Sequence, residues 1–347
     1  MILSEIKQSE YRDKIWSEIL EILSDLPSCS KLDEEEAILR QGNLLKPPRS
    51  LGQLEDIAIF LAGWNLKKLE DIKTVQAIIF AGNHGVCNQS VNPFPQEVTF
   101  QMVETFREGK AAINKICELN DINLNVIPIN LERPTRDITL GRAMDMDEFI
   151  EAFNIGIQAI SSDIDLVCLG EMGIGNTTIS SALCYNFFGG NLNSWVGPGT
   201  GADNAQQLNK EKVIEKALEI NRPNMKRPLS ALYSIGGREQ AAICGALLAS
   251  RYFSIPVILD GFVCTAAVLP LVMENKEMLD HCLVGHCSKE PGHSDLVKRL
   301  GKVPILNLEM ALGEGSGAAL SVQIIKAALK CHSEMPTFEE AGVSGKS

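Results

Sequence analysis

The sequence predicts an α/β fold in which a parallel, Rossmann-like sheet is flanked by helices, with a small helical domain beside it. Short apolar runs suited to buried strands, at residues 76–81, 124–129, 165–169 and 256–261, alternate with longer segments of helical periodicity. Glycine-rich stretches follow several of these runs, where parallel strands end and ligands bind. At 347 residues the chain is long enough for one large domain and a smaller one.

The first 45 residues are expected to form a helical element ahead of the sheet. Apolar residues recur at helical spacing up to Pro27, namely Ile15, Ile19, Ile22, Leu23 and Leu26. A second, acidic helix should begin near Leu32 and end near Gly42. We therefore expect residues 1–45 to be the N-terminal helical element of the small domain, and residues 46–347 to be the large α/β catalytic domain.

The helices of the large domain are predicted from the residues that begin and end them. Ser50 and Gln53 have the spacing of a capping box, and Gly63 should end the helix that they begin. Pro95 is placed to open one helix over residues 96–116. A charged connection follows the strand that ends at Ile129, and further helices are expected at residues 179–188, 239–252 and 265–273.

Composition disfavours several classes of function. A formal net charge of -12 and a pI near 5.0 would repel both nucleic acid and an anionic membrane surface. The polar N-terminus and the lack of an apolar run of roughly 20 residues predict a soluble, cytoplasmic protein. The ten cysteines lie scattered in apolar segments, which predicts buried free thiols in a reducing compartment.

Residues 312–317 hold one carboxylate between glycines, directly before a long apolar helix pattern. Glycines allow a backbone to approach a ligand closely, and the free N–H groups at a helix start attract anions. Leu312, Gly313, Glu314 and Gly315 are therefore candidates for a pocket wall. The alternative is a plain tight turn with Glu314 pointing into water.

Residues 170–178 (GEMGIGNTT) follow a predicted strand and resemble the dinucleotide fingerprint. Thr178 stands where the third glycine of G-x-G-x-x-G should be, which disfavours a nicotinamide-dependent oxidoreductase. A glycine turn at a helix start still suits a phosphate or a ribose, and a simple strand-to-helix corner is the alternative. The candidate nucleotide-binding residues here are Glu171, Gly173, Gly175, Asn176 and Thr177.

Residues 197–201 (GPGTG) form a second loop suited to an anion, ahead of a helix that begins near Asp203. Lys210 lies about two turns into that helix, from where it could meet a phosphate. The alternative for this lysine is an ordinary solvated surface position. The candidates in this stretch are Gly199, Thr200, Gly201, Asp203 and Lys210.

Histidine and cysteine residues gather at residues 281–293, but none has the spacing of zinc ligands. We therefore predict no metal site from His281, His286 and His293. His84 follows a strand end and is a candidate for the pocket wall, with a buried core histidine as the alternative. Residues 345–347 (GKS) match the end of a P-loop by chance, because the upstream glycine is absent.

Taken together, these stretches resemble the nicotinate-nucleotide–dimethylbenzimidazole phosphoribosyltransferase family. The resemblance rests on residues 46–47 (KP), 50–52 (SLG), 81–86 (AGNHGV), 95–99 (PQEVT), 101–103 (QMV), 170–178, 199–201 (GTG), 260–262 (DGF), 290–293 (EPGH) and 312–317 (LGEGSG). It runs in the order of the family from about residue 46 to residue 344, and so many coincident motifs are highly specific.

The resemblance implies transfer of phosphoribose from nicotinate mononucleotide to an aromatic base, giving an α-ribazole phosphate for cobalamin. It also implies a parallel six-stranded sheet, a homodimer, small-molecule substrates and no metal or other cofactor. The acid at Glu314 would be the general base, and Phe94 and Gln101 would line the base pocket. The nucleotide would lie among Glu171, Gly173, Lys210, Ser288 and Gly315.

Five positions depart from the pattern of the family: Arg49, Asn83, Pro93, Phe94 and Asn204. These departures leave the reaction class intact and concern the identity of the accepted base. Two other classes stay open, a binding protein without turnover and a hydrolase that passes the ribosyl group to water.

Overall fold

The computed structural model describes residues 12–64 and 72–344. Its centre is a sheet of six strands in the order β2-β1-β3-β4-β5-β6, and all neighbouring strands are parallel. The strands are β1 (Val75–Ala81), β2 (Asn123–Pro128), β3 (Leu166–Met172), β4 (Val257–Leu259), β5 (Cys282–His286) and β6 (Pro304–Leu306). The predicted α/β fold with a Rossmann-like parallel sheet is confirmed.

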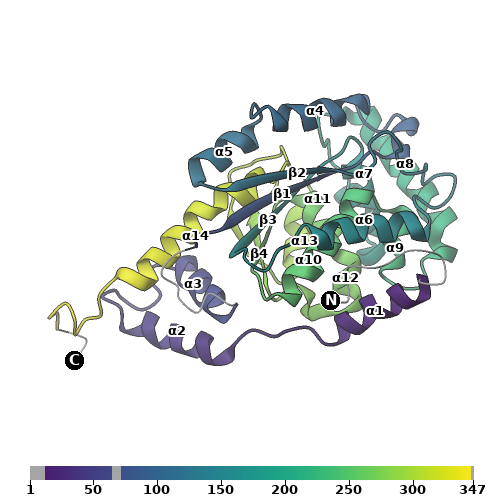
Figure 1. Ribbon diagram of the computed structural model, residues 1–347. Coiled ribbons are helices and arrows are strands. Elements are labelled where there is room, and N and C mark those ends of the chain that lie inside the picture. Colours follow the sequence, from purple (N-terminus) through teal and green to yellow (C-terminus); the bar gives the residue numbers. More distant parts are fainter. Residues whose placement is uncertain (1–11, 65–71, 345–347) are drawn as a thin grey trace.

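Helices cover both faces of this sheet (Figure 1). Helices α6 and α10 pack on one face, and α5 and α14 pack on the other. The α-helices are α1 (Arg12–Ser24), α2 (Lys31–Asn43), α3 (Gln53–Gly63), α4 (Glu97–Arg107), α5 (Ala112–Asn120), α6 (Met146–Gln158), α7 (Asn176–Phe188), α8 (Asn204–Asn221), α9 (Ser230–Ile235), α10 (Arg238–Tyr252), α11 (Phe262–Ala267), α12 (Leu269–Glu274), α13 (His293–Arg299) and α14 (Ser316–Glu334).

Successive side chains of a strand point to these two layers in turn. In β1, Ile78 and Phe80 belong to the apolar core on the side of α6 and α10. Ala77 and Ile79 belong to the core on the side of α5 and α14. Because both faces are covered, β1 is a continuous apolar run rather than an alternating one, as its sequence predicts.

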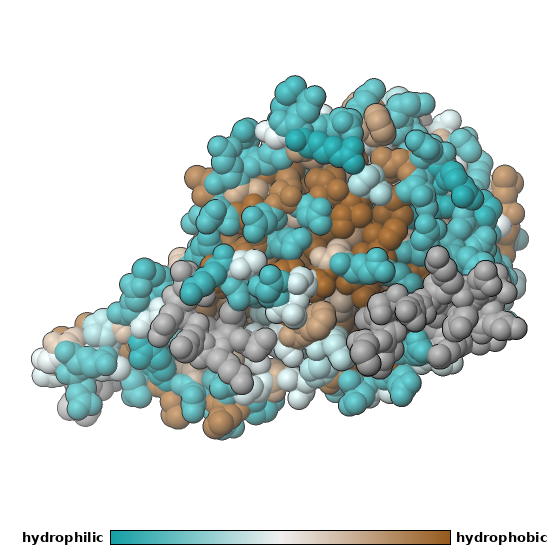
Figure 2. Space-filling view, in the orientation of Figure 1, coloured by the Kyte–Doolittle hydropathy of each residue, from teal (hydrophilic) through white to brown (hydrophobic). Residues whose placement is uncertain are grey.

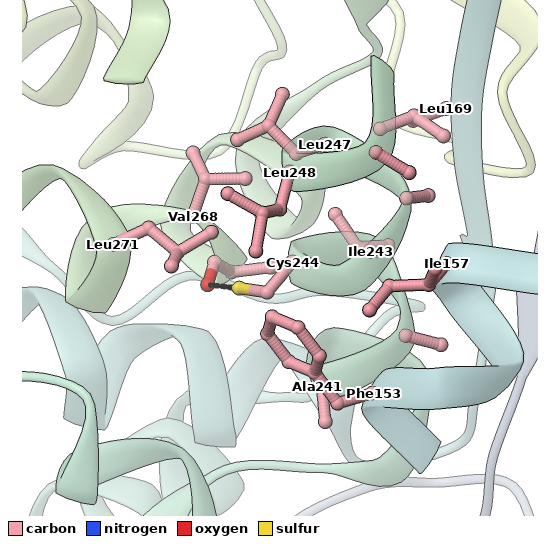
Figure 3. Close-up of a cluster of buried hydrophobic side chains, with 14 of the residues drawn as sticks. Phe153, Ile157, Leu169, Ala241, Ile243, Cys244, Leu247, Leu248, Val268 and Leu271 are labelled. Atoms are coloured by element: carbon pink, nitrogen blue, oxygen red, sulfur yellow. Dashed lines mark hydrogen bonds between the residues drawn. The ribbon is translucent and has the colours of Figure 1, made fainter. Parts of the chain in front are cut away.

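Helices α6 and α10 approach each other closely at two glycines. A Cβ atom on Gly156 would lie 1.9 Å from the backbone oxygen of Ala242. A Cβ atom on Gly245 would lie 1.9 Å from the backbone oxygen of Phe153. Figure 3 shows the buried apolar cluster around this contact. The two helices therefore pack backbone to backbone, and no side chain fits at either position.

The predicted capping box at Ser50 is wrong. Helix α3 begins after Gly52, whose φ of 55° lies in the left-handed region, and no side chain caps this end. Glu55 reaches back instead, and its Oε1 accepts a hydrogen bond from the N–H of Leu51 at 3.0 Å. The same carboxylate forms a buried ion pair with Lys46 at 3.0 Å. A charged side chain inside the first turn thus replaces the hydroxyl cap.

Three further helix predictions need correction. The single helix predicted over residues 96–116 is α4 and α5, divided at Gly109, whose φ is 71°. The helix predicted over residues 265–273 is split between α11 and α12, because Pro270 lacks the N–H that would continue the ladder. The connection after β2 contains α6, which begins with a capping box of Asp145 and Glu148.

The two N-terminal helices contact different parts of the molecule (Figure 1). Trp16 of α1 lies against Phe149 of α6, with ring centroids 6.2 Å apart. In α2, Arg40 donates hydrogen bonds to the backbone oxygens of His332 and Ser333, at 2.7 and 2.9 Å, at the end of α14. The boundary at residue 45 between a small helical domain and the large domain stays a proposal, because these contacts tie both helices to the large domain.

All ten cysteines are free thiols, as predicted, but only six are buried, and Cys29, Cys87, Cys287 and Cys331 are partly exposed. Burial raises the pKa of Cys117 to about 12, which keeps this thiol protonated and unreactive. Within residues 12–64 and 72–344, no helix is long and apolar enough to cross a membrane. The polar start of the chain and the P-loop-like residues 345–347 lie outside the described residues.

The close contact of α6 and α10 gives a stability prediction. Gly245→Ala should lower the free energy of unfolding by about 1–3 kcal/mol or more, because the new methyl group must push the two backbones apart. Gly42→Ala is the matched control, since nothing lies within 4 Å of its Cβ position in α2, and it should be neutral or slightly stabilising. Urea unfolding with an unchanged m-value measures both. Equal stability of the two variants would contradict this packing.

Candidate active site

A pocket lies at the carboxyl ends of β3, β4 and β5, the edge of a parallel sheet at which ligands bind. The segment after β3, the loop before α8 and the segment before α14 complete its wall. The predicted site residues that line this pocket are Glu171, Gly173, Asn176, Thr177, Gly199, Thr200, Ser288, Leu312, Gly313 and Glu314.

Glu314 stands in an unusual backbone conformation at the start of α14. Its φ is 63°, and the flanking Gly313 and Gly315 have φ values of 78° and 77°. A glutamate in the left-handed region carries strain that neighbouring contacts must offset. Its carboxylate is turned inward, and the residue is only 6% exposed. The turn therefore directs one acid into the pocket, as the sequence predicted.

Asp260, directly after β4, fixes this turn. Its carboxylate accepts hydrogen bonds from the backbone N–H groups of Gly315, Gly317 and Ala318, at 3.2, 2.7 and 2.9 Å. These N–H groups would otherwise lack partners at the helix start, where the helix dipole also favours a negative charge. Nε2 of His286 lies 3.7 Å from the same carboxylate. One buried acid thus ties the segment of Glu314 to the sheet.

Glycines bring the start of α14 directly against the sheet. A Cβ atom on Gly170 of β3 would lie 2.6 Å from the backbone nitrogen of Gly315. A Cβ atom on Gly317 would lie 2.0 Å from the ring of His286. The glycines at these positions are therefore required by close approach, and they place Glu314 above the end of β3.

Glu171 is the second acid of the pocket and belongs to β3, not to a loop as its sequence context indicated. It accepts a hydrogen bond from the side-chain amide of Asn176 and packs against Gly313. Burial raises the pKa of Glu171 to about 8, and the nearby Asp260, Glu239 and Glu314 contribute to this rise.

The pKa of Glu314 is also raised, to about 7, first by burial and then by the charge of Asp260. Glu171, Asp260 and Glu314 lie close together and are poorly solvated, so ionising all three at once is unfavourable. Near neutral pH, Glu171 therefore holds a proton while Glu314 exchanges one. A group with a pKa near the working pH is well suited to proton transfer.

The pocket wall also includes hydrogen-bond donors. Helix α7 begins after Gly175, whose φ is 95°, so that Asn176 and Thr177 stand in its first turn. Gly199 and Thr200 face them from the loop before α8. Lys210 lies behind this loop, and its Nζ donates to the backbone oxygen of Gly197 at 3.1 Å and to Thr177 Oγ1 at 3.4 Å.

The remaining predicted site residues do not line this pocket: His84, Phe94, Gln101, Gly175, Gly201, Asp203, Lys210 and Gly315. His84 is fully buried, with Nε2 3.0 Å from Oε1 of Glu239, which fits the alternative of a core histidine. Asp203 is an exposed cap of α8, where it accepts a hydrogen bond from Gln206 N–H at 2.8 Å. Phe94 and Gln101 are exposed, in the segment before α4 and on α4 itself.

Sequence reasoning assigned no role to three acidic or imidazole side chains of the pocket wall. Asp260, His286 and Glu290 all follow or end a strand, and the first and last belong to motifs quoted above. A polar residue at the carboxyl end of each buried strand was the signal that could have found them. The partners of Asp260 lie about 55 residues away in the chain, so its capping role was not visible locally.

In the segment 281–293, His293 makes hydrogen bonds with neighbouring protein groups. Nδ1 of His293 accepts from the N–H of Ser288 at 2.8 Å, and its Nε2 lies 3.2 Å from Thr265 Oγ1. Within the described ranges, no group of three or more His, Cys, Asp or Glu side chains is arranged to hold a metal ion.

The raised pKa of Glu171 predicts a pH-dependent stability. Its folded-state pKa of about 8 lies above the ordinary value of 4.5, so its contribution is complete below pH 4.5 and is lost as the pH rises towards 8. Because glutamine does not titrate, Glu171→Gln should not lose this stability. As the pH rises from 4.5 to 8, the free energy of unfolding of the variant should therefore gain on the order of 4 kcal/mol relative to wild type.

Urea unfolding of both proteins between pH 4.5 and pH 8 measures this difference. Glu132→Gln, at an exposed position, is the control and should follow the wild-type pH dependence. Parallel stability curves for wild type and Glu171→Gln would contradict a buried, protonated Glu171.

Comparison with known proteins agrees with this geometry. The family model DBI_PRT, described as phosphoribosyltransferase, matches residues 27–343. The nicotinate-nucleotide–dimethylbenzimidazole phosphoribosyltransferase of Brucella anthropi is 47% identical over 325 residues, which are 94% of this chain and 96% of that protein. The protein of the same name from Rhizobium meliloti is 48% identical over 326 residues, with the same two shares.

A solved structure matches the whole fold. The crystal structure of CobT from Thermus thermophilus superimposes with a TM-score of 0.83 at 34% identity, covering 90% of this chain and 99% of that one. The matches span both the sheet and the glycine-rich segments of the pocket. The chain therefore belongs to the nicotinate-nucleotide–dimethylbenzimidazole phosphoribosyltransferase family.

Proposed function

We propose that this protein transfers phosphoribose from nicotinate mononucleotide to 5,6-dimethylbenzimidazole or a related aromatic base. The products are nicotinate and α-ribazole 5′-phosphate, which serves the assembly of the cobalamin nucleotide loop. The names of the two relatives support this activity. The observation that carries it is the buried carboxylate of Glu314, which has a pKa of about 7 and lines the same pocket as the glycine-rich loops at residues 173–177 and 199–200.

The reaction needs little from the protein beyond position, charge and one proton acceptor. The pyridinium ring of nicotinate mononucleotide is already a good leaving group. The protein must hold the base in line with the ribose, stabilise the positive charge that develops on the sugar, and remove the N–H proton of the incoming azole. The ionised carboxylate of Glu314 can take that proton, and the acids around the pocket favour a cationic sugar.

We assign the remaining site residues to the two substrates. Phe94, Gln101 and Leu312 contact or support the base. The nucleotide lies among Glu171, Gly173, Gly175, Asn176, Thr177, Gly199, Thr200, Gly201, Asp203, Lys210, Ser288, Gly313 and Gly315. We assign no metal or other cofactor to the reaction.

We also propose that the protein is a cytoplasmic homodimer. Figure 2 shows apolar residues gathered in the middle of one face, with polar residues around them. A contiguous apolar area of this kind is typical of a surface that another protein covers. The ten free thiols fit a reducing compartment.

The direct test is incubation of the protein with nicotinate mononucleotide, with and without 5,6-dimethylbenzimidazole. Nicotinate and a ribazole phosphate should appear together, and only when the base is present. Release of nicotinate without the base would identify a hydrolase. Binding without release of nicotinate would identify a binding protein.

Glu314→Gln should lower kcat by roughly 10²–10⁴-fold and leave nucleotide binding nearly unchanged, because the amide keeps the shape and loses the basicity. In wild type, kcat should rise about tenfold per pH unit below a pKa of about 7 and level off above it, since only the ionised carboxylate accepts a proton. The kcat of the variant should not show this rise with pH.

Steady-state kinetics from pH 5 to pH 9 with bases of graded N–H acidity measures both effects. The deficit of the variant should shrink as the N–H becomes more acidic. A deficit that is the same for all bases would contradict proton abstraction by Glu314.

Phe94→Ala tests the assignment of the base side. The exposed aromatic ring is available to stack on a flat heterocycle, so its loss should raise KM for the base more than KM for the nucleotide. Phe100→Ala is the matched control, because Phe100 is an exposed phenylalanine on the neighbouring helix. Equal effects on both substrates, or an equal effect of Phe100→Ala, would remove Phe94 from the base site.

A further inference from the structure

One acid of the pocket stands on the side where the nucleotide phosphate is expected. Oε1 of Glu290 accepts a hydrogen bond from the N–H of Gly199 at 3.0 Å. Among the residues that the structure describes, none is a hydrogen-bond partner of its Oε2, which lies 2.2 Å from the position of a Cβ atom on Gly197. Glu290 is 8% exposed and lines the pocket, so this free oxygen is buried beside the loop.

The loop at residues 197–199 lies between this carboxylate and an ammonium group. Lys210 donates from the other side, to the backbone oxygen of Gly197 and to Thr177 Oγ1. Burial raises the pKa of Glu290, and the charge of Lys210 lowers it in part. Burial likewise lowers the pKa of Lys210, and the charge of Glu290 offsets this in part. The two groups therefore compensate each other's burial.

Other titratable groups around Glu290 do not replace Lys210 as its partner. His293 of α13 stands behind Ser288, and its pKa is lowered to about 3 by burial, so that it is neutral at neutral pH. His286 of β5 lies beside Asp260. The acids Glu171 and Glu314 belong to the same pocket wall and add negative charge to it.

A phosphate bound here meets a direct conflict. A phosphate monoester carries about −1.5 to −2 charges at pH 7, and its oxygens seek the same amide that Glu290 already occupies. Two anions that share one donor in a site with little water cannot both remain fully ionised. The conflict is resolved if Glu290 takes up a proton, because a neutral carboxyl group can donate to the phosphate and release the amide.

We propose that Glu290 is a proton-linked placeholder for the phosphate of the nucleotide. In the free protein its carboxylate holds the N–H of Gly199 in place. When the nucleotide binds, Glu290 takes one proton from solvent, the Gly199 amide turns to a phosphate oxygen, and the new O–H of Glu290 donates to the phosphate. This inference rests on the proposed function, because it requires that the phosphate of nicotinate mononucleotide binds at this loop.

Calorimetric titration of nicotinate mononucleotide at pH 8, in two buffers of different ionisation enthalpy, counts the protons taken up on binding. Wild type should take up close to one proton more than Glu290→Gln, whose amide keeps the shape and cannot titrate. Wild-type affinity should fall by up to tenfold per pH unit above neutral pH, and the affinity of the variant should change much less. Glu314→Gln is the matched control and should keep the additional proton.

The outcomes separate the two proposals. If nicotinate mononucleotide binds with the same proton uptake in wild type and in Glu290→Gln, the placeholder role is wrong and the proposed function stands. If wild type does not bind nicotinate mononucleotide at all, the proposed function fails, and this inference fails with it.

A second measurement needs no variant and serves if Glu290→Gln does not fold. Inorganic sulfate stays dianionic at neutral pH, so that any proton taken up on its binding must go to the protein. When sulfate is titrated into wild type in the same two buffers, the protein should also take up a proton. Sulfate binding without proton uptake would overturn the placeholder role.

Discussion

The three hydrogen bonds from the start of α14 to the buried carboxylate of Asp260 are the contact on which the site depends. They satisfy N–H groups that a helix start leaves open, and they offset part of the cost of burying a charge. They also hold Gly315 against the end of β3, which leaves the preceding Glu314 in its left-handed conformation. The position of the proposed general base is therefore set by backbone contacts with the sheet, not by its own side chain.

The same arrangement sets the proton affinities of the pocket. Asp260 is kept in place by backbone donors and His286, and its charge then acts on both other acids. Burial raises both pKa values, and the pKa of Glu171 rises further than that of Glu314, because Glu171 lies near the charges of Asp260, Glu239 and Glu314, whereas only Asp260 adds to the effect of burial at Glu314. The two glutamates thus differ in protonation near pH 7 without differing in chemistry, and only one of them is free to accept a proton.

The sequence was sufficient for the features that depend on local pattern. The parallel sheet followed from apolar runs with glycine-rich ends, and the pocket position of Glu314 followed from its flanking glycines. The errors arose where distant contacts decide. The capping box at Ser50 gave way to Glu55, whose conformation is fixed by Lys46, and β6 is a short edge strand of half-buried residues without a strong apolar run. His84 was predicted to line the pocket because the sequence around it gives no sign of its partner Glu239, which lies more than 150 residues further along the chain.

The proposed base-binding and nucleotide-binding parts of the site differ in how tightly they are packed. The acids and the amide-rich loops stand on strand ends and helix starts, where a single added methyl group would collide with backbone atoms, as at Gly170 and Gly173. Phe94 and Gln101 are exposed and are held by few contacts of this kind. A substitution on the base side can therefore alter which aromatic base is accepted while the proton acceptor and the phosphate loops stay in place. Of the departures from the pattern of the family, Pro93 and Phe94 lie on this proposed base side, whereas Asn204 begins α8 beside the proposed nucleotide loop, so the separation accounts for the first departure and not for the second.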